Sequence, residues 1–164
     1  MSIDVRPARA SDLPAILAIY NGVIRDTLAI WKDEPVDLAE REAWFAARRR
    51  AGHPVLVADV AGEIAGYAAA GDFRGGSGFR LVCENSVHVA PAFVRRGVAR
   101  ALMLRLMEEA ARSGRTHMVA AIGLPNDASI ALHEALGFER VGLMPGIGVK
   151  RGERLDLLLM QRSL

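Results

Sequence analysis

The segment of residues 79–114 limits the possible folds more than any other, because it joins a strand-like run to a helix-like run through a short basic turn. Residues 79–89 are rich in small, β-branched and apolar residues, which predicts a strand, and Pro91 prevents its continuation. From Gly97 to a stop near residues 113–114, apolar residues recur at helical spacing: Ala99, Leu102, Met103, Leu106 and Ala110. The sequence therefore predicts a strand that leads directly into the N-terminus of a long helix.

The turn between these elements has the chemistry of an anion site. Backbone N–H groups at the start of a helix have no carbonyl partner and lie at the positive end of the helix dipole. Gly97 and Ala99 are small enough for a ligand to approach the backbone, and positive charge comes from Arg95, Arg96 and Arg100. A site for a pyrophosphate is expected, and the alternative is an ordinary connection with solvated arginines. A Walker loop needs Gly-Lys-Ser/Thr, which the sequence lacks, and Gly97 stands alone rather than in a dinucleotide fingerprint.

The order of elements along the chain predicts an α+β domain. Strands are expected near residues 3–6, 54–58, 64–69, 79–89, 117–122, 139–149 and 155–161, and further helices from residue 11, over 37–50 and over 128–136. We expect Ser11 to cap the first helix with Pro14 in its first turn, and the second helix to point Leu38, Trp44 and Phe45 inward. This mixed order indicates a partly antiparallel central sheet, and no repeat or linker divides residues 1–164, so a single domain is expected.

Composition narrows the class of protein further. With 51% hydrophobic residues in 164, the chain does not belong to the disordered class. Lys and Arg total 21 and Asp and Glu total 19, so we expect no strongly basic face and no nucleic-acid partner. No signal-peptide run or membrane-spanning stretch is present in the sequence, which predicts a cytoplasmic protein without a membrane partner. The single cysteine, Cys83, excludes an intramolecular disulfide and a Cys-based zinc site, and we expect no metal.

A second motif lies at residues 126–138. Asn126 stands between an expected strand and an expected helix, where its side chain can cap the helix or bond an amide of a ligand. Gly137 ends that helix. His133 lies seven residues after Asn126, about two turns along the same face. A lone histidine on a helix is more often structural than catalytic, so both interpretations of His133 stay open here.

Residues 94–99 (Val-Arg-Arg-Gly-Val-Ala) and 126–138 together resemble the GNAT superfamily of acetyl-CoA-dependent N-acetyltransferases. Its fingerprints are Gln/Arg-x-x-Gly-x-Gly/Ala and Asn-x-x-Ser/Ala-x-x-Leu, the latter followed by Gly-Phe. Within it the chain is similar to the phosphinothricin and methionine sulfoximine N-acetyltransferases, through residues 19–21, 73–74, 79–80, 84–87, 132–133 and 155–157. The resemblance spans nearly the whole chain and implies a GNAT-like fold, a mixed, mostly antiparallel twisted sheet of about seven strands flanked by about four helices.

The resemblance also implies where acetyl-CoA, as co-substrate, and the amine would bind. Backbone groups for the pantetheine and the acetyl carbonyl would come from Val87, His88 and Val89. The remaining contacts to acetyl-CoA would come from Arg95, Arg96, Gly97, Val98, Ala99, Arg100, Asn126 and His133. The amine substrate would lie by Glu84 and by a loop containing Phe73, Arg74, Ser77, Gly78, Phe79 and Arg80. The sequence departs from the family at Val94, where Gln or Arg is usual, at His88, where this branch usually has Tyr, and at Gly76, Ser77 and Arg154.

Acetyl transfer to an amine needs a base, a place for oxyanion charge and a proton for the thiolate. Glu84 is the candidate base, and the alternative is an ordinary polar residue of a strand. A backbone N–H of residues 87–89 would meet the oxyanion, and His133 would either protonate the thiolate or only contact CoA. Arg74 and Arg80 either pair with an anionic group of an amino-acid substrate or are solvated. Cys83 is expected on the opposite strand face from Glu84, as a buried small hydrophobe.

The sequence thus predicts an enzyme that transfers acetyl from acetyl-CoA, by direct attack, to the α-amino group of a small amino-acid analogue. Methionine sulfoximine, methionine sulfone and phosphinothricin are the expected type, and the resemblance implies a homodimer that confers antibiotic or herbicide resistance. Another amine, such as a protein N-terminus, a polyamine or an aminoglycoside, stays an alternative. A non-catalytic acyl-CoA sensor and a nucleotide-binding interaction domain are the alternatives from other classes.

Overall fold

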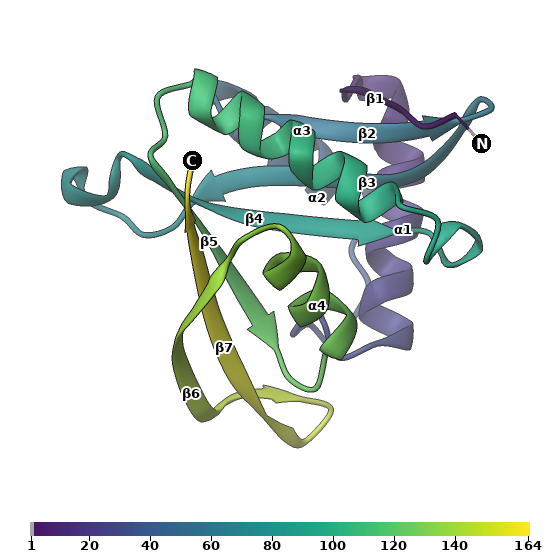
Figure 1. Cartoon of the computed structure of the whole chain (residues 1–164). Helices are drawn as coiled ribbons and strands as arrows, with labels where there is room; N and C mark the ends of the chain where they lie inside the picture. The colour runs from purple at the N-terminus through teal and green to yellow at the C-terminus, as the bar shows by residue number, and fades with distance from the viewer. Residues whose placement is uncertain (1) are drawn as a thin grey trace.

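The computed structural model describes residues 2–164 and contains one seven-stranded sheet with the strand order β1-β2-β3-β4-β5-β7-β6 (Figure 1). The strands are β1 (Asp4–Pro7), β2 (Val55–Val60), β3 (Glu63–Asp72), β4 (Val82–Val89), β5 (His117–Gly123), β6 (Glu139–Lys150) and β7 (Glu153–Ser163). The α-helices are α1 (Leu13–Asp26), α2 (Leu38–Arg50), α3 (Val98–Arg112) and α4 (Asp127–Ala135). The sheet is antiparallel except between β4 and β5, so the predicted α+β, GNAT-like architecture is confirmed. None of the helices within residues 2–164 is long and apolar enough to cross a bilayer.

The central strands carry a core on each face of the sheet. Successive side chains of a strand point to opposite faces. In β2 and β3, Leu56, Ala58, Ala68 and Ala70 pack in a core with α3, while Val55, Val57, Tyr67 and Ala69 pack in a second core with α1 and α2. Burial on both faces explains why these two strands read as nearly continuous apolar runs rather than as an alternation.

The strands β4 and β5 separate after a short parallel pairing. They are paired only from Val82 with His117 to Glu84 with Val119, after which β4 remains paired with β3 and β5 with β7. Figure 1 shows the two strands diverging beyond this point. The backbone N–H and C=O groups of residues 85–89 that face β5 therefore have no hydrogen-bond partner in a neighbouring strand. A ligand or water must supply that partner. We call this opening, bounded by residues 85–89 and 120–123, the β4–β5 fork.

The structure corrects three local predictions. Helix α1 follows a 3₁₀ turn, Ala10–Asp12, and its N-cap is Asp12 rather than Ser11, because Arg6 and the Arg9 N–H hold the Asp12 carboxylate at 2.8 and 2.7 Å. Pro14 does lie in the first turn. Leu38 is 37% exposed, because it begins α2 at the edge of the packed face, whereas Phe45 is buried as predicted. Strand β4 begins at Val82 rather than at residue 79, since residues 77–79 form a 3₁₀ turn.

The end of α1 is tied to the turn between β6 and β7. Lys150 is fully buried, and its Nζ donates to the carbonyl oxygens of Ile24, Thr27 and Ile30 at 2.7, 2.8 and 2.7 Å. The Trp31 indole occupies space that a Cβ would need at residues 123 and 148, both of which are glycine. These contacts hold the segment after α1, residues 27–32, against β5 and against the turn between β6 and β7, although the contacting residues are more than 90 positions apart in the chain.

Candidate active site

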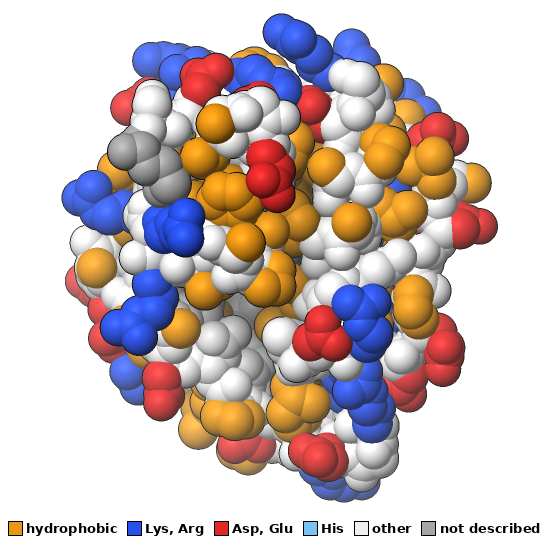
Figure 2. Space-filling view, turned by 90° about the vertical axis from the view of Figure 1, so that its right-hand side faces the viewer, with side chains coloured by type: hydrophobic (Ala, Val, Ile, Leu, Met, Phe, Trp, Pro, Cys, Tyr) orange, Lys and Arg blue, Asp and Glu red, His pale blue; other side chains and the backbone are white. Residues whose placement is uncertain are grey.

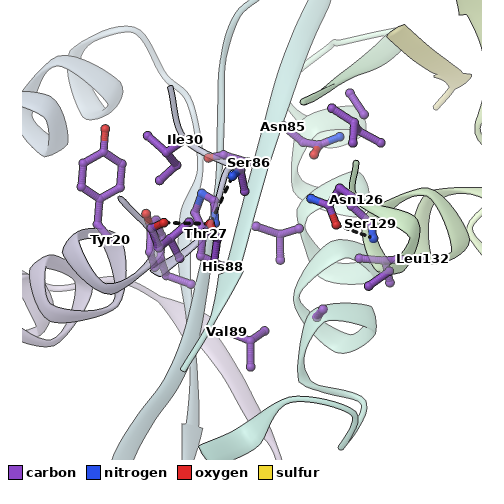
Figure 3. A pocket seen from close by; sticks show the side chains of 18 of the residues that line it. Tyr20, Thr27, Ile30, Asn85, Ser86, His88, Val89, Asn126, Ser129 and Leu132 are labelled. Carbon is purple, nitrogen blue, oxygen red and sulfur yellow. Dashed lines mark hydrogen bonds between the residues drawn. The ribbon is translucent and has the colours of Figure 1, made fainter. Parts of the chain in front are cut away.

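A cavity of about 850 Å³ lies at the β4–β5 fork. Its walls come from α1, α2, β3, β4, the turn before α3, β5 and the start of α4. On the face shown in Figure 2 the surface is hollowed along its middle, with hydrophobic side chains gathered in the hollow. Figure 3 shows Tyr20, Thr27 and Ile30 on one side of the cavity and Asn126, Ser129 and Leu132 on the other, with side chains of β4 between them.

The turn before α3 forms one end of the cavity. Val94, Arg95, Gly97, Val98, Ala99 and Arg100 line it. Gly97 is the N-cap of α3 with φ +83° and no side chain bonded to the helix end, so the first N–H groups of α3 are open to a ligand. The predicted anion site therefore has an open helix N-terminus and two lining arginines. The Arg96 side chain does not line the cavity, and its guanidinium lies 5.7 Å from the Phe93 ring centroid instead.

Strand β4 contributes the central wall. Val87, His88 and Val89 line the cavity beside the open backbone of the fork. His88 packs on Tyr67 with 5.5 Å between the ring centroids, and burial lowers the pKa of His88 to about 4. Its imidazole is therefore neutral at physiological pH.

Asn126 and His133 lie where α4 meets the cavity. The Asn126 Oδ1 accepts from the N–H of Ser129 at 3.2 Å and caps α4, as predicted, while the side chain also lines the cavity. His133 is 2% exposed, and its Nδ1 donates to the Ser129 carbonyl oxygen at 2.8 Å. Its Nε2 lies 3.2 Å from Oδ1 of Asn85, and the side-chain nitrogen of Asn85 donates to the Val119 carbonyl oxygen. Burial lowers the pKa of His133, which favours the neutral imidazole.

Glu84 stands at the base of the fork, as the last residue of β4 that pairs with β5. It lines the cavity and is half-buried, and loss of hydration raises the pKa of its carboxyl group, an effect that the nearby Arg48 partly offsets. Cys83 is fully buried in the core on the other face, as predicted. Burial raises the pKa of the Cys83 thiol to about 11, so this residue is not a nucleophile at neutral pH.

The other end of the cavity was missed by the sequence analysis. We call it the acceptor compartment, and it is lined by Tyr20, Val23, Thr27, Ala29, Ile30, Lys32, Glu40, Arg41, Trp44, Arg48 and Tyr67. Arg41 is 4% exposed, pairs with Glu40 at 2.5 Å and lies 3.9 Å from the Tyr20 ring centroid. These residues come from two helices, a connecting segment and a strand, and nothing in their local spacing marks them as one group.

The loop expected to bind the amine lies elsewhere. None of Phe73, Arg74, Ser77, Gly78, Phe79 and Arg80 lines the cavity within residues 2–164. Phe73 and Phe79 pack edge to face at 5.7 Å, and Arg74 lies over the Phe73 ring. Arg80 donates to the carbonyl oxygen of Ser77 at 3.0 Å. The Arg80 carbonyl oxygen also accepts from Arg115, so the loop contacts the segment after α3, and its role in binding the amine stays a prediction.

Residues 2–164 contain no group of three or more His, Cys, Asp or Glu side chains placed to hold a metal ion. The open strand edge of the fork can bond an extended amide-containing chain, and the adjacent helix N-terminus can bind a phosphate. An acyl-CoA has both parts, an extended amide-containing arm and a pyrophosphate. The cavity therefore has the features expected of an acyl-CoA-dependent acyltransferase.

Comparison with known proteins defines the family. The model of the acetyltransferase (GNAT) family matches residues 16–138. The L-methionine sulfoximine/L-methionine sulfone acetyltransferase of Pseudomonas paraeruginosa is 51% identical over 165 residues, covering 100% of this chain and 96% of that protein. The chain belongs to the GNAT family and is an N-acetyltransferase, so the resemblance drawn from the two sequence motifs is confirmed.

Solved structures agree with this assignment. A phosphinothricin acetyltransferase from Sinorhizobium meliloti, in complex with AcCoA, has a TM-score of 0.96 and 37% identity, covering 100% of this chain and 89% of that one. A ribosomal-protein-alanine N-acetyltransferase from Brucella melitensis has a TM-score of 0.96 and 46% identity, covering 98% of this chain and 99% of that one. The named relatives thus include enzymes that act on small amino-acid analogues and one named for a protein.

Proposed function

We propose that the chain acetylates the α-amino group of a small amino acid of the methionine sulfone, methionine sulfoximine or phosphinothricin type, with acetyl-CoA as donor. The observation that carries this proposal is the half-buried carboxylate of Glu84 between the open β4 backbone and the acceptor compartment. That compartment is bounded by α1, α2 and residues 27–32, which favours a small acceptor over a protein chain. The relative of 51% identity named for methionine sulfoximine and methionine sulfone supports the same substrate class.

In the proposed reaction, Glu84 takes a proton from the ammonium group of the acceptor, which leaves a neutral amine. The amine nitrogen forms a bond to the thioester carbonyl carbon and the carbon–sulfur bond breaks. The second proton of the nitrogen passes to the departing thiolate, so that an amide and a free thiol result. Backbone N–H groups of residues 87–89 would donate to the carbonyl oxygen as it gains negative charge.

The same proposal assigns the donor side of the site. The N-terminus of α3 with Arg95 and Arg100 would hold the pyrophosphate, and Asn126 would bond the pantetheine arm through the amide hydrogens that its capping role leaves free. His133 would contact the donor, because it lines the cavity where α4 meets it. Acetylation removes the charge of an amine and alters its recognition by other proteins, so the proposal includes resistance to such amines.

The experiment that tests the substrate class is a thiol-release assay with acetyl-CoA and a panel of amines. Methionine sulfone, methionine sulfoximine and phosphinothricin are expected to give the highest kcat/KM values, ahead of polyamines and aminoglycosides. Peptides that begin with alanine test the second candidate, a protein N-terminus, which the relative named for a ribosomal protein favours. Activity confined to these peptides would remove the small-substrate assignment, and thiol release with none of the amines would remove the enzyme proposal itself.

We further propose that the chain forms the homodimer that the family resemblance implies, and that its two copies associate through β6. This strand is at the edge of the sheet and exposes Val141, Leu143, Ile147 and Val149, each at least 50% accessible. An apolar stripe on an edge strand is suited to a second copy of itself. Sedimentation is expected to show a dimer, and Leu143→Glu together with Ile147→Glu is expected to give a folded monomer. A wild-type monomer at micromolar concentration would contradict this proposal.

A further inference from the structure

Arg48 lies in the last turn of α2, and its side chain crosses the face of β3 toward the cavity. A Cβ built on Gly71 would lie 2.6 Å from the Arg48 Cζ, so the guanidinium rests directly on the strand backbone at this residue. No other residue type at position 71 would leave this space free. The position of the charged group is therefore set by contact with the sheet and not by a flexible surface arrangement.

The Arg48 guanidinium has no partner of opposite charge. Its Nε is buried and finds no hydrogen-bond acceptor within residues 2–164, and no carboxylate of the described chain lies within ion-pair distance. Arg41, in the same compartment, is paired with Glu40 and stacked on an aromatic ring. A guanidinium that lines a cavity and has no ion-pair partner within the described chain is available to an anionic ligand, which would pair with its terminal nitrogens.

Glu84 lines the same cavity as this cation, whereas Asp72, which Arg48 also influences, is hydrogen-bonded to His53 and does not line the cavity within the described chain. Gly71 and Glu84 are opposite each other in the antiparallel β3–β4 pair, and opposed residues present their side chains on the same face. The positive charge of Arg48 lowers the pKa of Glu84, which is the expected effect of a cation nearby. One anion and one cation thus lie side by side at the base of the fork without being bonded to each other.

We propose that Arg48 binds the α-carboxylate of the amino-acid acceptor, so that Glu84 and Arg48 together recognise the two charged groups on its α-carbon. The ammonium and carboxylate groups of an amino acid are roughly 3 Å apart, which requires neighbouring sites of opposite charge. A guanidinium binds a carboxylate through two parallel hydrogen bonds and so also orients the amine. This inference rests on the proposed function, because it names the group by which that site selects amino acids.

Other cations do not have this placement. Arg74 and Arg80, which the sequence analysis considered for the same role, lie outside the cavity within the described chain. Arg95 and Arg100 belong to the turn at the opposite end, and Lys32 is exposed on the rim. The carboxylate site is therefore assigned to a residue that the sequence analysis did not single out.

The test compares two acceptors that differ by one group, methionine sulfone and 3-(methylsulfonyl)propylamine, which lacks only the carboxylate. Arg48→Met is expected to raise KM for methionine sulfone about 10- to 100-fold, as for loss of a charge-assisted contact, with a much smaller change in kcat. The value of kcat/KM for the amine should be low with the unaltered enzyme and change less than about threefold in Arg48→Met. The KM of Arg48→Lys for methionine sulfone should lie between those of the unaltered enzyme and Arg48→Met, because lysine keeps the charge but not the paired donors.

Arg50→Met is the matched control, because Arg50 is exposed, lies in the same turn and does not line the cavity. It is expected to leave both acceptors unaffected. An equal loss with both acceptors in Arg48→Met, or no loss with either, would overturn the carboxylate assignment while leaving acetyl transfer intact.

Calorimetric titration of the CoA-bound protein with methionine sulfone gives a readout that does not depend on turnover. The proposal is supported if Arg48→Met raises the Kd for methionine sulfone at least tenfold. It is contradicted if the two proteins bind methionine sulfone equally, or if the unaltered protein does not bind it. Failure of the proposed function has a different signature, since no amine would then release thiol whatever residue stands at position 48.

Discussion

Replacing Glu84 with Gln is expected to lower kcat by about 100-fold or more. An α-ammonium group is not nucleophilic, and Glu84 is the carboxylate that the fold places in the wall between the open β4 backbone and the acceptor compartment. Glutamine keeps the size and the polar contacts of the side chain but accepts no proton. Affinity for acetyl-CoA, measured by calorimetry, should change little, because the expected donor contacts come from residues 87–89 and from the turn before α3.

The pH dependence of kcat gives a second readout of the same residue. Burial raises the pKa of Glu84, and the ionised form is the active base. Activity should therefore be absent at pH values well below this raised pKa and should increase as the pH rises through it. In Glu84→Gln that limb should disappear. Glu63→Gln is a matched control, since Glu63 is exposed at the start of β3, and a near-normal kcat for Glu84→Gln would exclude Glu84 as the base.

Replacing Lys150 with Met is expected to lower the free energy of unfolding by about 3 kcal/mol or more. The Nζ of this fully buried lysine makes three hydrogen bonds to carbonyl oxygens at and after the end of α1. Methionine fills a similar volume but leaves these acceptors without a donor. A loss of this size corresponds to a decrease in Tm of roughly 6–12 °C for a chain of this length.

The functional consequence should be specific to the acceptor. Residues 27–32 include four that line the acceptor compartment, so release of this segment should raise KM for the amine more than KM for acetyl-CoA. Arg151→Met is the control on the same turn, because Arg151 donates to two carbonyls of α1 but is exposed. In urea unfolding, Arg151→Met should lower the free energy of unfolding by well under half as much as Lys150→Met does. Equal costs for the two variants would show that the buried ammonium group is not the main tether.

The local geometry of the expected donor side could be predicted because its residues are close together in the chain. A strand, a proline and a glycine determine the turn before α3 through backbone geometry alone, and Asn126 caps the helix that it precedes. Strand periodicity correctly separated Glu84 from Cys83, since neighbouring side chains point to opposite faces. The prediction that Ser11 caps α1 was wrong, because contacts of Asp12 with Arg6 and Arg9 place the cap one residue later. The prediction that Leu38 points inward was wrong, because Leu38 lies at the edge of the packed face of α2.

The acceptor compartment could not be predicted in the same way. Tyr20, Arg48 and Tyr67 share no periodicity with Glu84 and become neighbours only after α1 and α2 pack on the sheet. The loop containing Arg74 and Arg80 carries the expected charges, but within the described chain it does not line this cavity. The charge of a side chain is visible in a sequence, whereas the presence or absence of its partner is not.

The sequence by itself determined the order of strands and helices, because short-range backbone and periodicity rules specify it. The same rules determined the open N-terminus of α3, which is suited to an anion, and the strand face to which the Glu84 carboxylate points. Only the tertiary structure decided that β4 and β5 separate, that Lys150 holds the segment after α1, and that Arg48 stays unpaired beside Glu84. These features depend on which distant residues pack together, because pairing and burial are properties of the folded chain and not of any segment alone.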